Sequence, residues 1–416
     1  MRAGLQWLYP GIGIKRWLLL AFAGAVLLAY SALFAWGVFF SPGLLRALGM
    51  GWLEKRHLAA VVLAADGLAV GLLALLVGAW RVWVFQRTTP ESAAAIRAAA
   101  RLARGPRVVA VGGGNGLAAL LRGLKAHTSN LTAVVTMADD GGSSGRLRRD
   151  MGMPPPGDLR NCLVALADDE SLISRLFQYR FENGGELQGH SFGNLFLAAL
   201  TAVTGDFERA VRESTHVLKV RGRVLPSTLD DVTLHAQLED GRAVAGESSI
   251  TAAARLPRRV WLEPERPRAL PQALTALRDA DLVVLGPGSL YTSVLPNVLI
   301  PEVREALQRT RAWVVYVCNV MTEPGETDGY SAADHLEALY RHGLRGAVDI
   351  VVVNDAPVRP DLVAAYGRAG AAPVACDRER LRALGVKVVT APVVAESDVV
   401  RHDPARLAEV LLRLVR

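Results

Sequence analysis

The residues best suited to binding chemistry lie in a glycine-rich turn near residue 112. An apolar run at 108–111 (VVAV) leads into this turn, and an amphipathic stretch follows it to residue 124. Glycines let the backbone approach an anion closely, and the first turn of a helix offers N–H groups without partners. The turn predicts a phosphate-binding loop, although it lacks the GxGxxG spacing and packing alone is the alternative. Its candidate ligand-binding residues are Gly112, Gly113, Gly114 and Asn115.

A second polar loop follows the apolar run at 131–136 (LTAVVT). Loops at the carboxyl ends of parallel strands are where open α/β proteins bind ligands. Its carboxylates suit a sugar hydroxyl, a base edge or Mg²⁺, and its arginine suits a phosphate. The alternative is a solvated surface turn. The candidate residues are Asp139, Asp140, Gly141, Gly142, Ser143, Ser144 and Arg146.

Two helix starts carry further candidates. In MPPPGDLRNC (153–162), Asp158 is either an N-cap or a ligand contact, and Asn161 follows three residues later. In GHSFGNLF (189–196), His190 and Asn194 are four residues apart and can point into one cleft. On its own, such a histidine is more often structural than catalytic.

Two more apolar runs end in polar turns. ADLVVL (280–285) is followed by Gly286, Gly288 and Ser289, and AWVVYV (312–317) by Asn319 and Thr322. We expect the segment 323–330 to cover the site as a mobile flap. Late in the chain, Arg401 either returns a cation to the cleft or belongs to a plain charge cluster at a helix start.

Composition limits the other classes of function. The chain has 416 residues, a formal net charge of +7 and three cysteines without a CxxC spacing. A disulfide framework and a structural zinc site are therefore not expected. Basic residues are not interleaved with aromatics in a run, which argues against nucleic acid as a partner. We expect no required cofactor and no catalytic residue that the sequence alone identifies.

From residue 106 the pattern alternates short β-branched apolar runs with helical stretches. This pattern predicts an α/β fold with a mostly parallel sheet flanked by helices. A helical block is expected over about 158–220, and alternating polar and apolar residues between 224 and 264 predict a small antiparallel insertion.

The first 87 residues read as a membrane anchor. Two apolar stretches, about 17–40 and 58–80, are each long enough to cross a bilayer, and tryptophans stand near their ends. The arginines and lysines that flank them favour both ends inside and the loop outside. Asp66 in the second stretch is either functional or a tolerated polar residue, paired across the hairpin or protonated. A helical linker (88–105) precedes the domain at 106–416.

Several consecutive segments resemble motifs of the YvcK/CofD-like family, over roughly residues 106–405. They are VGGGNGL, TMADDGGSSGRLR, PPPGDLRNCLVAL, HSFGNLFL, LGPGSLYTSVLPNVLIP and CNVMTEPGETDGYSAADH. The resemblance implies a Rossmann-like nucleotide site built from the glycine turn, the Asp-Asp-Gly-Gly loop and the Gly-Pro-Gly-Ser turn. Typical members begin close to the VGGG strand, so the N-terminal hairpin departs from the family pattern.

The MTEPGETDGYSAADH stretch resembles the YvcK branch. That branch implies a regulator that binds UDP-N-acetylglucosamine or a related nucleotide sugar and is linked to gluconeogenic growth, cell-wall synthesis and cell shape. The alternative is a CofD-type 2-phospholactate transferase with a GDP-linked donor and a deazaflavin acceptor, for which Asp139 and Asp140 would hold Mg²⁺. A dinucleotide-binding protein without sugar specificity is a third, weaker reading.

The expected location is the cytoplasmic membrane, with the large C-terminal domain in the cytoplasm. The expected partners are the nucleotide ligand, the membrane, further copies of the chain and proteins of envelope synthesis.

Overall fold

The computed structural model describes residues 15–40, 57–88, 98–167, 172–183, 185–395 and 397–415. The chain forms two compact units, Met1–Ala99 and Ala100–Arg416. We describe each unit by itself.

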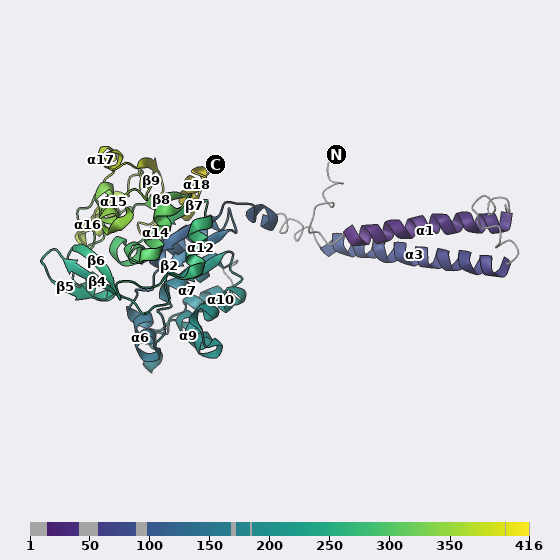
Figure 1. Ribbon diagram of the computed structural model, residues 1–416, viewed down its shortest axis with the longest axis horizontal. Coiled ribbons are helices and arrows are strands. Elements are labelled where there is room, and N and C mark those ends of the chain that lie inside the picture. The colour runs from purple at the N-terminus through teal and green to yellow at the C-terminus, as the bar shows by residue number, and fades with distance from the viewer. Residues whose placement is uncertain are drawn as a thin grey trace. The chain divides into compact units, whose positions relative to one another are not determined.

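Two long helices make up the described part of the first unit. α1 (Lys15–Phe40) and α3 (His57–Thr88) lie side by side (Figure 1). Within them, Arg16–Trp36 and Val61–Trp83 are long and apolar enough to cross a membrane. Most of their large apolar side chains face outward, as expected where lipid and not water surrounds a helix pair.

Small residues let the backbones of these two helices approach closely. A Cβ atom built on Gly24 would lie 2.6 Å from the backbone nitrogen of Leu75 and 2.8 Å from the carbonyl oxygen of Gly71. A Cβ on Gly78 would lie 2.8 Å from the Cβ of Ala21. Such seams of small residues are typical of helices that pack within a bilayer.

The sequence placed the second helix correctly but too short, because α3 continues beyond residue 80 to Thr88. Asp66 is exposed on α3, and no described residue of α1 forms a hydrogen bond or ion pair with it. The expected outside loop (41–56) and most of the expected linker helix (89–97) lie outside the described residues. Residues 98–102 are helical.

A seven-stranded parallel sheet organises the second unit. Its order is β10-β9-β8-β7-β1-β2-β3, and every pairing is parallel. Four of these strands expose none of their residues, because helices cover both faces of the sheet. The strands are β1 (Val108–Gly112), β2 (Leu131–Val135), β3 (Arg223–Pro226), β7 (Leu282–Leu285), β8 (Trp313–Val317), β9 (Ile350–Asn354) and β10 (Lys387–Ala391).

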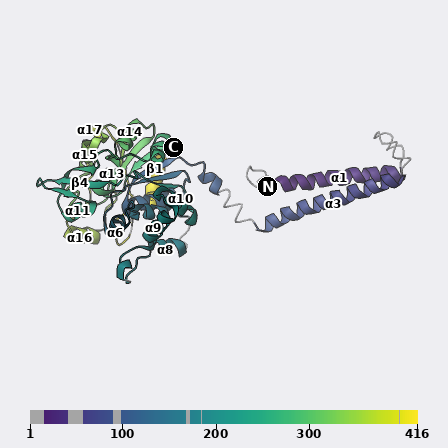
Figure 2. The ribbon, with the colours of Figure 1, turned by 60° about the horizontal axis from the view of Figure 1, so that its bottom comes forward.

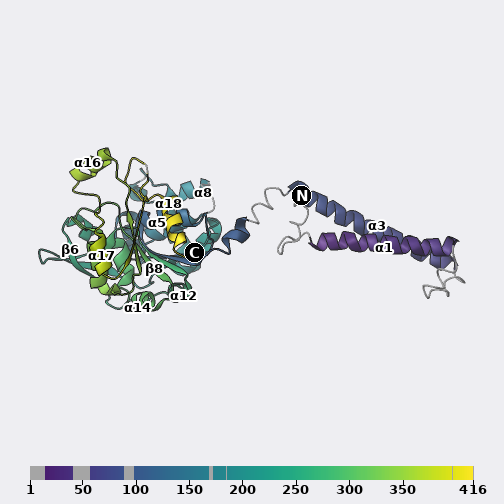
Figure 3. The same cartoon turned by 90° about the horizontal axis from the view of Figure 1, so that it is seen from above.

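The strand order changes direction between β1 and β7. From β1 the chain proceeds outward through β2 and β3, and from β7 it proceeds the other way through β8, β9 and β10. Right-handed crossovers then place the two sets of helices on opposite faces. Figure 3 agrees, with α5 (Gly114–Leu124) and α18 (Pro404–Arg413) on one side of the strands and α12 (Pro271–Asp279) and α14 (Pro301–Arg309) on the other. Such a switch point opens a crevice at the carboxyl ends of the two central strands.

Helices fill the connection from β2 to β3, as the sequence predicts. They are α6 (Gly142–Met151), α7 (Gly157–Leu166), α8 (Leu172–Gln178), η3 (Gly185–Leu187), α9 (Phe192–Thr204) and α10 (Phe207–Val217). The connections between β7 and β10 contain further short helices besides α14. They are η4 (Leu290–Val294), α13 (Leu295–Val298), α15 (Ala332–Leu339), η5 (Tyr340–Leu344), α16 (Pro360–Arg368) and α17 (Arg378–Ala383).

The antiparallel insertion is present but starts later than predicted. Residues 224–226 belong to β3 of the parallel sheet, because β3 pairs with β2 in parallel register. The insertion itself is a three-stranded sheet of order β5-β4-β6. It consists of β4 (Thr233–Leu238), β5 (Ala243–Ala245), the short helix α11 (Glu247–Ala252) and β6 (Pro257–Glu263). Figure 2 shows α11 beside β4.

Candidate functional site

The glycine turn joins β1 to α5 at the switch point. Gly113 is the N-cap of α5 with extended backbone and, being a glycine, has no side chain with which to cap the helix. The first-turn N–H groups of α5 are therefore directed past the end of β1, where an anion would be favoured. The carboxylate of Asp158 accepts a hydrogen bond from the backbone N–H of Gly114 and so holds one side of the turn.

Two glycines of this turn are required by close contacts. A Cβ on Gly113 would lie 2.4 Å from Oδ2 of Asp158. A Cβ on Gly116 would lie 2.4 Å from the carbonyl oxygen of Pro287, in the turn that follows β7. The loops after β1 and β7 thus touch backbone to backbone, and only glycine fits between them.

A cavity of about 590 Å³ opens beside these loops, within the range of small-molecule sites. It is bounded by the loops after β1, β7 and β8, by the start of α11, by the end of α16 and by the segment before α18. The lining residues are Gly113, Gly114, Asn115, Gly116, Ala119, Glu247, Pro287, Gly288, Ser289, Ser293, Asn319, Val320, Met321, Thr322, Glu323, Pro324, Tyr366, Ala369, Ala371, Val400, Arg401 and His402.

One wall of the cavity is acidic. Glu247, at the start of α11, is half-buried, and its pKa is raised to about 9 by burial and by the carboxylates of Asp139, Asp158, Asp140 and Glu326. Burial and Asp139 likewise raise the pKa of Asp158 to about 6. At neutral pH the carboxyl of Glu247 is therefore uncharged and can donate a hydrogen bond.

The two aspartates after β2 hold the loop in place. Oδ1 of Asp139 accepts a hydrogen bond from the N–H of Gly141 at 2.9 Å. Oδ1 of Asp140 accepts from both the N–H and the hydroxyl of Ser248, at 2.8 and 2.7 Å. Asp140 therefore supports α11, and neither aspartate is among the residues that line the cavity.

The structure offers no complete metal site from protein groups alone. Within the described ranges, no group of three or more His, Cys, Asp or Glu side chains lies in positions to hold a metal ion. A divalent ion at Asp139 or Asp140 would need most of its ligands from phosphate oxygens and water, the usual arrangement for Mg²⁺. All three cysteines are free thiols, with Cys162 and Cys318 buried.

The segment expected to be a mobile flap is instead packed into the domain. Glu326 is 3% exposed, and its carboxylate accepts hydrogen bonds from the hydroxyl of Thr292 at 3.0 Å and the N–H of Tyr291 at 3.4 Å. Burial and the nearby Glu323 raise the pKa of Glu326 to about 7. The segment after β8 is thus fixed to η4 and forms a wall of the cavity.

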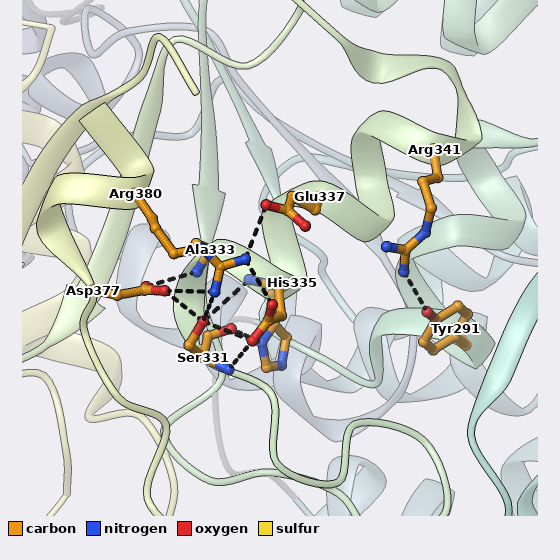
Figure 4. Close-up of polar contacts among 9 residues, drawn as sticks. Tyr291, Ser331, Ala333, His335, Glu337, Arg341, Asp377 and Arg380 are labelled. Atoms are coloured by element: carbon orange, nitrogen blue, oxygen red, sulfur yellow. Dashed lines mark hydrogen bonds and ion pairs between the residues drawn. The ribbon is translucent and has the colours of Figure 1, made fainter. Parts of the chain in front are cut away.

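A polar network at the start of α15 holds the C-terminal end of the segment after β8 (Figure 4). Ser331 and Asp334 form a capping box at the start of α15, and Asp377 accepts hydrogen bonds from the Ser331 hydroxyl and the Ala333 N–H. Arg380 of α17 donates to Asp334 and Glu337, each at 2.9 Å. The same view shows Arg341 donating to the hydroxyl of Tyr291 at 3.4 Å.

The segment before α18 brings a cation and a histidine to the cavity. Arg401 is exposed and is the one lysine or arginine among the described lining residues. Nε2 of His402 donates to the carbonyl oxygen of Cys318 at 3.2 Å, and burial lowers the pKa of His402 to about 4. His402 is therefore neutral at pH 7, and Arg401 supplies the positive charge.

Other predicted residues form a second buried cluster, separate from the cavity lining. The Ser143 hydroxyl accepts from Nδ2 of Asn194 at 3.1 Å and is also hydrogen-bonded to Nδ1 of His190 at 3.0 Å. Asn161 is connected to this cluster through Arg160. The Arg160 guanidinium donates to Oδ1 of Asn161 at 2.8 Å and to the hydroxyl of Ser191. His190 and Asn194 both contact Ser143, so they point the same way as their spacing suggests, but this cluster connects α6, α7 and α9.

The structure therefore divides the predicted residues into three groups. The residues that line the cavity are Gly113, Gly114, Asn115, Gly288, Ser289, Asn319, Thr322 and Arg401. Gly112 ends β1, Gly286 follows β7, and the residues that shape the neighbouring loops are Asp139, Asp140, Gly141, Gly142, Ser144 and Asp158. Arg146 points elsewhere, since it donates to the carbonyl oxygen of Gln188 at 2.8 Å.

The prediction that Asp158 is an N-cap is wrong, whereas a ligand contact by Asp158 stays a prediction. Pro156 is the N-cap of α7, and Asp158 lies in the first turn. Glu247 lines the cavity but was not predicted from the sequence, and it is the chemically most important of the lining residues that were missed. Only its place in a Gly-Glu-Ser-Ser turn between alternating strands could have drawn attention to it.

Comparisons with known proteins agree with this architecture. Residues 108–394 match the family model described as 2-phospho-L-lactate transferase CofD. The chain is 49% identical to the gluconeogenesis factor of Bacillus subtilis, over 75% of this chain and 98% of that protein. It is 46% identical to a Nostoc protein provisionally given the same name, over 98% of this chain and 92% of that protein.

The Nostoc alignment includes the hairpin region, so the N-terminal extension is shared with that relative. A crystal structure of a Bacillus halodurans protein superposes with a TM-score of 0.72 at 50% identity, covering 74% of this chain and all of that one. The sheet domain thus occurs elsewhere without the hairpin. With the motifs, the fold and these matches together, the chain belongs to the YvcK/CofD-like family.

Proposed function

We propose that the protein is a regulatory binding protein for a nucleotide sugar of the UDP-N-acetylglucosamine type. The observation that carries this proposal is the convergence, at the switch point of the sheet, of a helix N-terminus with a glycine N-cap, two further polar turns and one arginine on a single cavity. A nucleoside diphosphate sugar has the parts that such a cavity recognises, namely a diphosphate, hydroxyls and a base edge.

The diphosphate would lie against the turn after β1. The first-turn N–H groups of α5 and the guanidinium of Arg401 would stabilise its charge, and the Asn115 amide would add a hydrogen bond. Ser289 and Asn319 supply polar groups on the neighbouring turns, suited to hydroxyls of the ribose or the sugar.

A binding role is favoured over turnover by the chemistry of the lining. His402 is the one histidine among the described lining residues, and its Nε2 is engaged by the Cys318 carbonyl. The hydrogen-bonded Ser143 and His190 pair belongs to the other cluster. The relatives' name, gluconeogenesis factor, supports a link to growth on gluconeogenic carbon. A role in cell-wall synthesis and cell shape is part of the same proposal.

The two apolar helices support a location in the cytoplasmic membrane, with the sheet domain in the cytoplasm. Attachment there would place a nucleotide-sugar sensor near the synthesis of envelope precursors. Cysteines introduced singly in residues 41–56 and in the sheet domain test the topology. A reagent that cannot cross the membrane should label the former and not the latter in intact cells.

Calorimetric titration of the full chain in nanodiscs tests the ligand. UDP-N-acetylglucosamine and GDP would each be titrated with and without Mg²⁺. Binding of the UDP-sugar alone, independent of metal, is the expected result. Preference for GDP with a requirement for Mg²⁺ would contradict it. Expression in a Bacillus subtilis strain that lacks its gluconeogenesis factor would then test growth on gluconeogenic carbon.

A second candidate, a CofD-type transferase, is favoured by the family model that matches residues 108–394. The carboxylates of Asp139 and Asp140 in the loop after β2 would then assist a metal bound mainly by the donor's diphosphate. An assay with the deazaflavin Fo and a GDP-linked phospholactyl donor decides this case. Product formation would replace the regulatory proposal, whereas binding of UDP-sugar without any product would support it.

A further inference from the structure

Glu247 is the one acidic side chain that the antiparallel insertion contributes to the cavity lining among the described residues. It begins α11, whereas the glycine turn on another side of the same cavity comes from the parallel sheet. Its carboxyl makes no hydrogen bond or ion pair with any residue that the structure describes. A half-buried carboxyl that faces a cavity without a partner is available to a ligand.

The surroundings of Glu247 make a charged carboxylate there unfavourable. After burial, the charges of four other carboxyl groups raise its pKa: Asp139 and Asp140 from the loop after β2, Asp158 from α7, and Glu326 from the loop after β8. No lysine, arginine or histidine stands among the groups that shift its titration. A diphosphate bound in the same cavity would add further negative charge. This added charge would favour the protonated form of Glu247 further.

The hydrogen bonds between Asp140 and Ser248 fix the position of Glu247. The Asp140 carboxylate accepts both the N–H and the hydroxyl of Ser248, the residue next to Glu247. Its other oxygen, Oδ2, lies so close to Gly246 that a Cβ there would be only 2.1 Å away. The residues on both sides of Glu247 are thus held to the loop after β2.

We propose that Glu247 contacts the bound nucleotide directly as a neutral carboxylic acid that donates a hydrogen bond to a ligand oxygen, with Asp140 and Ser248 as its positioning residues. This proposal rests on the proposed function, because it needs the nucleotide in this cavity. It adds a recognition element from the insertion to the phosphate-binding elements of the parallel sheet.

Two substitutions distinguish the hydrogen-bond donor of Glu247 from its ability to ionise. Glu247→Gln keeps a hydrogen-bond donor and cannot ionise, so it should bind UDP-N-acetylglucosamine within about threefold of the wild type at pH 7. Glu247→Ala removes the donor and should weaken binding about tenfold. Ser248→Ala should weaken binding less, and the matched control Ser249→Ala, on the next residue of α11, should leave it unchanged.

The pH profile distinguishes a direct contact from a structural effect. Wild-type affinity should fall above about pH 9, where Glu247 ionises, whereas Glu247→Gln should not show this loss. Ionisation of the uracil base affects both proteins equally, so the difference between the two profiles isolates Glu247. Unchanged affinity of Glu247→Ala, or parallel profiles for the wild type and Glu247→Gln, would overturn the proposal.

A measurement without ligand separates this proposal from the proposed function. In the protein labelled with ¹³C at glutamate carboxyl groups, the signal that Glu247→Gln removes should titrate near pH 9. Titration near the ordinary value of 4.5 would overturn a neutral Glu247 whether or not a nucleotide binds. If the signal titrates as expected but neither UDP-N-acetylglucosamine nor GDP binds, the proposed function fails and the ligand contact fails with it.

Discussion

The carboxylate of Asp140 joins two segments that are 108 residues apart, by accepting hydrogen bonds from the backbone and the hydroxyl of Ser248. Asp140 follows β2 of the parallel sheet, and Ser248 lies in α11 of the antiparallel insertion. The two parts of the domain therefore form one cavity wall. A substitution at Asp140 should act on the ligand through α11 and not through a lost direct contact.

Asp140→Ala should weaken binding of UDP-N-acetylglucosamine without unfolding the domain. It removes Oδ1, which accepts both hydrogen bonds from Ser248, so α11 is expected to open locally and Glu247 to leave the cavity more often. The expected loss is roughly 1 to 2 kcal/mol of local stability. Hydrogen exchange measured by mass spectrometry should show faster exchange over residues 246–252 and little change in β1 and β7.

Asp150→Ala is a suitable control, because Asp150 lies near the end of α6, away from the cavity lining. Unchanged exchange in α11 together with lost binding would mean that Asp140 contacts the ligand itself. Unchanged binding of UDP-N-acetylglucosamine by Asp140→Ala would show that Asp140 does not contribute to the site.

The acidic wall predicts that the free protein loses stability as the pH rises from 7 to 9. The unfolded chain has already released the Glu247 proton at pH 7, since its ordinary pKa is 4.5, whereas the folded domain keeps this proton until about pH 9. The folded state binds more protons in this window, so the free energy of unfolding decreases with pH. For a half-buried group the expected decrease is roughly 1 to 2 kcal/mol.

Urea denaturation of the wild type and of Glu247→Gln at pH 7, 8 and 9 measures this decrease. The variant should lose less stability across the range. The opposite dependence expected from His402, whose pKa is lowered to about 4, lies below pH 6.5 and does not enter the window. Equal slopes for the two proteins would show that Glu247 does not hold its proton in the folded state.

The sequence predicted well what depends on local pattern. The strands after residue 106, the glycine turn and both hairpin helices are marked by runs of apolar residues and by glycines within a few positions. The strands β3 and β10 lie at the two edges of the sheet, and their half-exposed residues lack that signal.

The parts of the site that the sequence did not predict depend on contacts between residues that are far apart in the sequence. Glu247 reaches the cavity only because Asp140 holds Ser248, and nothing near Glu247 in the sequence encodes that contact. His190 and Asn194 were correctly placed on one face, yet the spacing of four could not tell which neighbour they would meet. They meet Ser143, and the cavity lies elsewhere.

Gly116→Ala should disrupt the contact between the loops after β1 and β7. A Cβ at residue 116 would lie 2.4 Å from the carbonyl oxygen of Pro287 and 3.0 Å from the N of Gly288, both backbone atoms. The loops must separate, at a cost of about 1 to 3 kcal/mol in the free energy of unfolding, with loss of ligand binding. Gly367→Ala in α16 is the matched control, because nothing lies within 4 Å of its Cβ position. Denaturation curves that are equal for both variants would contradict this account.

Arg401→Ala should weaken binding of the diphosphate ligand while leaving the fold intact. Arg401 is exposed at the cavity and is the one cation in its described lining. Loss of one charge-assisted hydrogen bond corresponds to roughly tenfold weaker binding, with a smaller salt dependence than the wild type. Arg266→Ala, at an exposed position outside the lining, is the control. Calorimetry at two salt concentrations measures both effects, and identical affinities would place the diphosphate away from Arg401.

Gly24→Val should separate the two hairpin helices without changing ligand binding. The valine side chain would meet the backbone of α3 at Leu75 and Gly71, where even a single Cβ comes within 2.8 Å. Because small residues let membrane helices pack closely, a branched side chain at this position should prevent the contact. Disulfide cross-linking between cysteines that replace Ser31 and Gly67, where a Cβ on residue 67 would lie 3.3 Å from the Cβ of residue 31, should decrease in membranes. Leu73→Val, at an outward-facing position that is 63% exposed, should leave cross-linking unchanged. Equal cross-linking in both variants would mean that the helices do not pair through this seam.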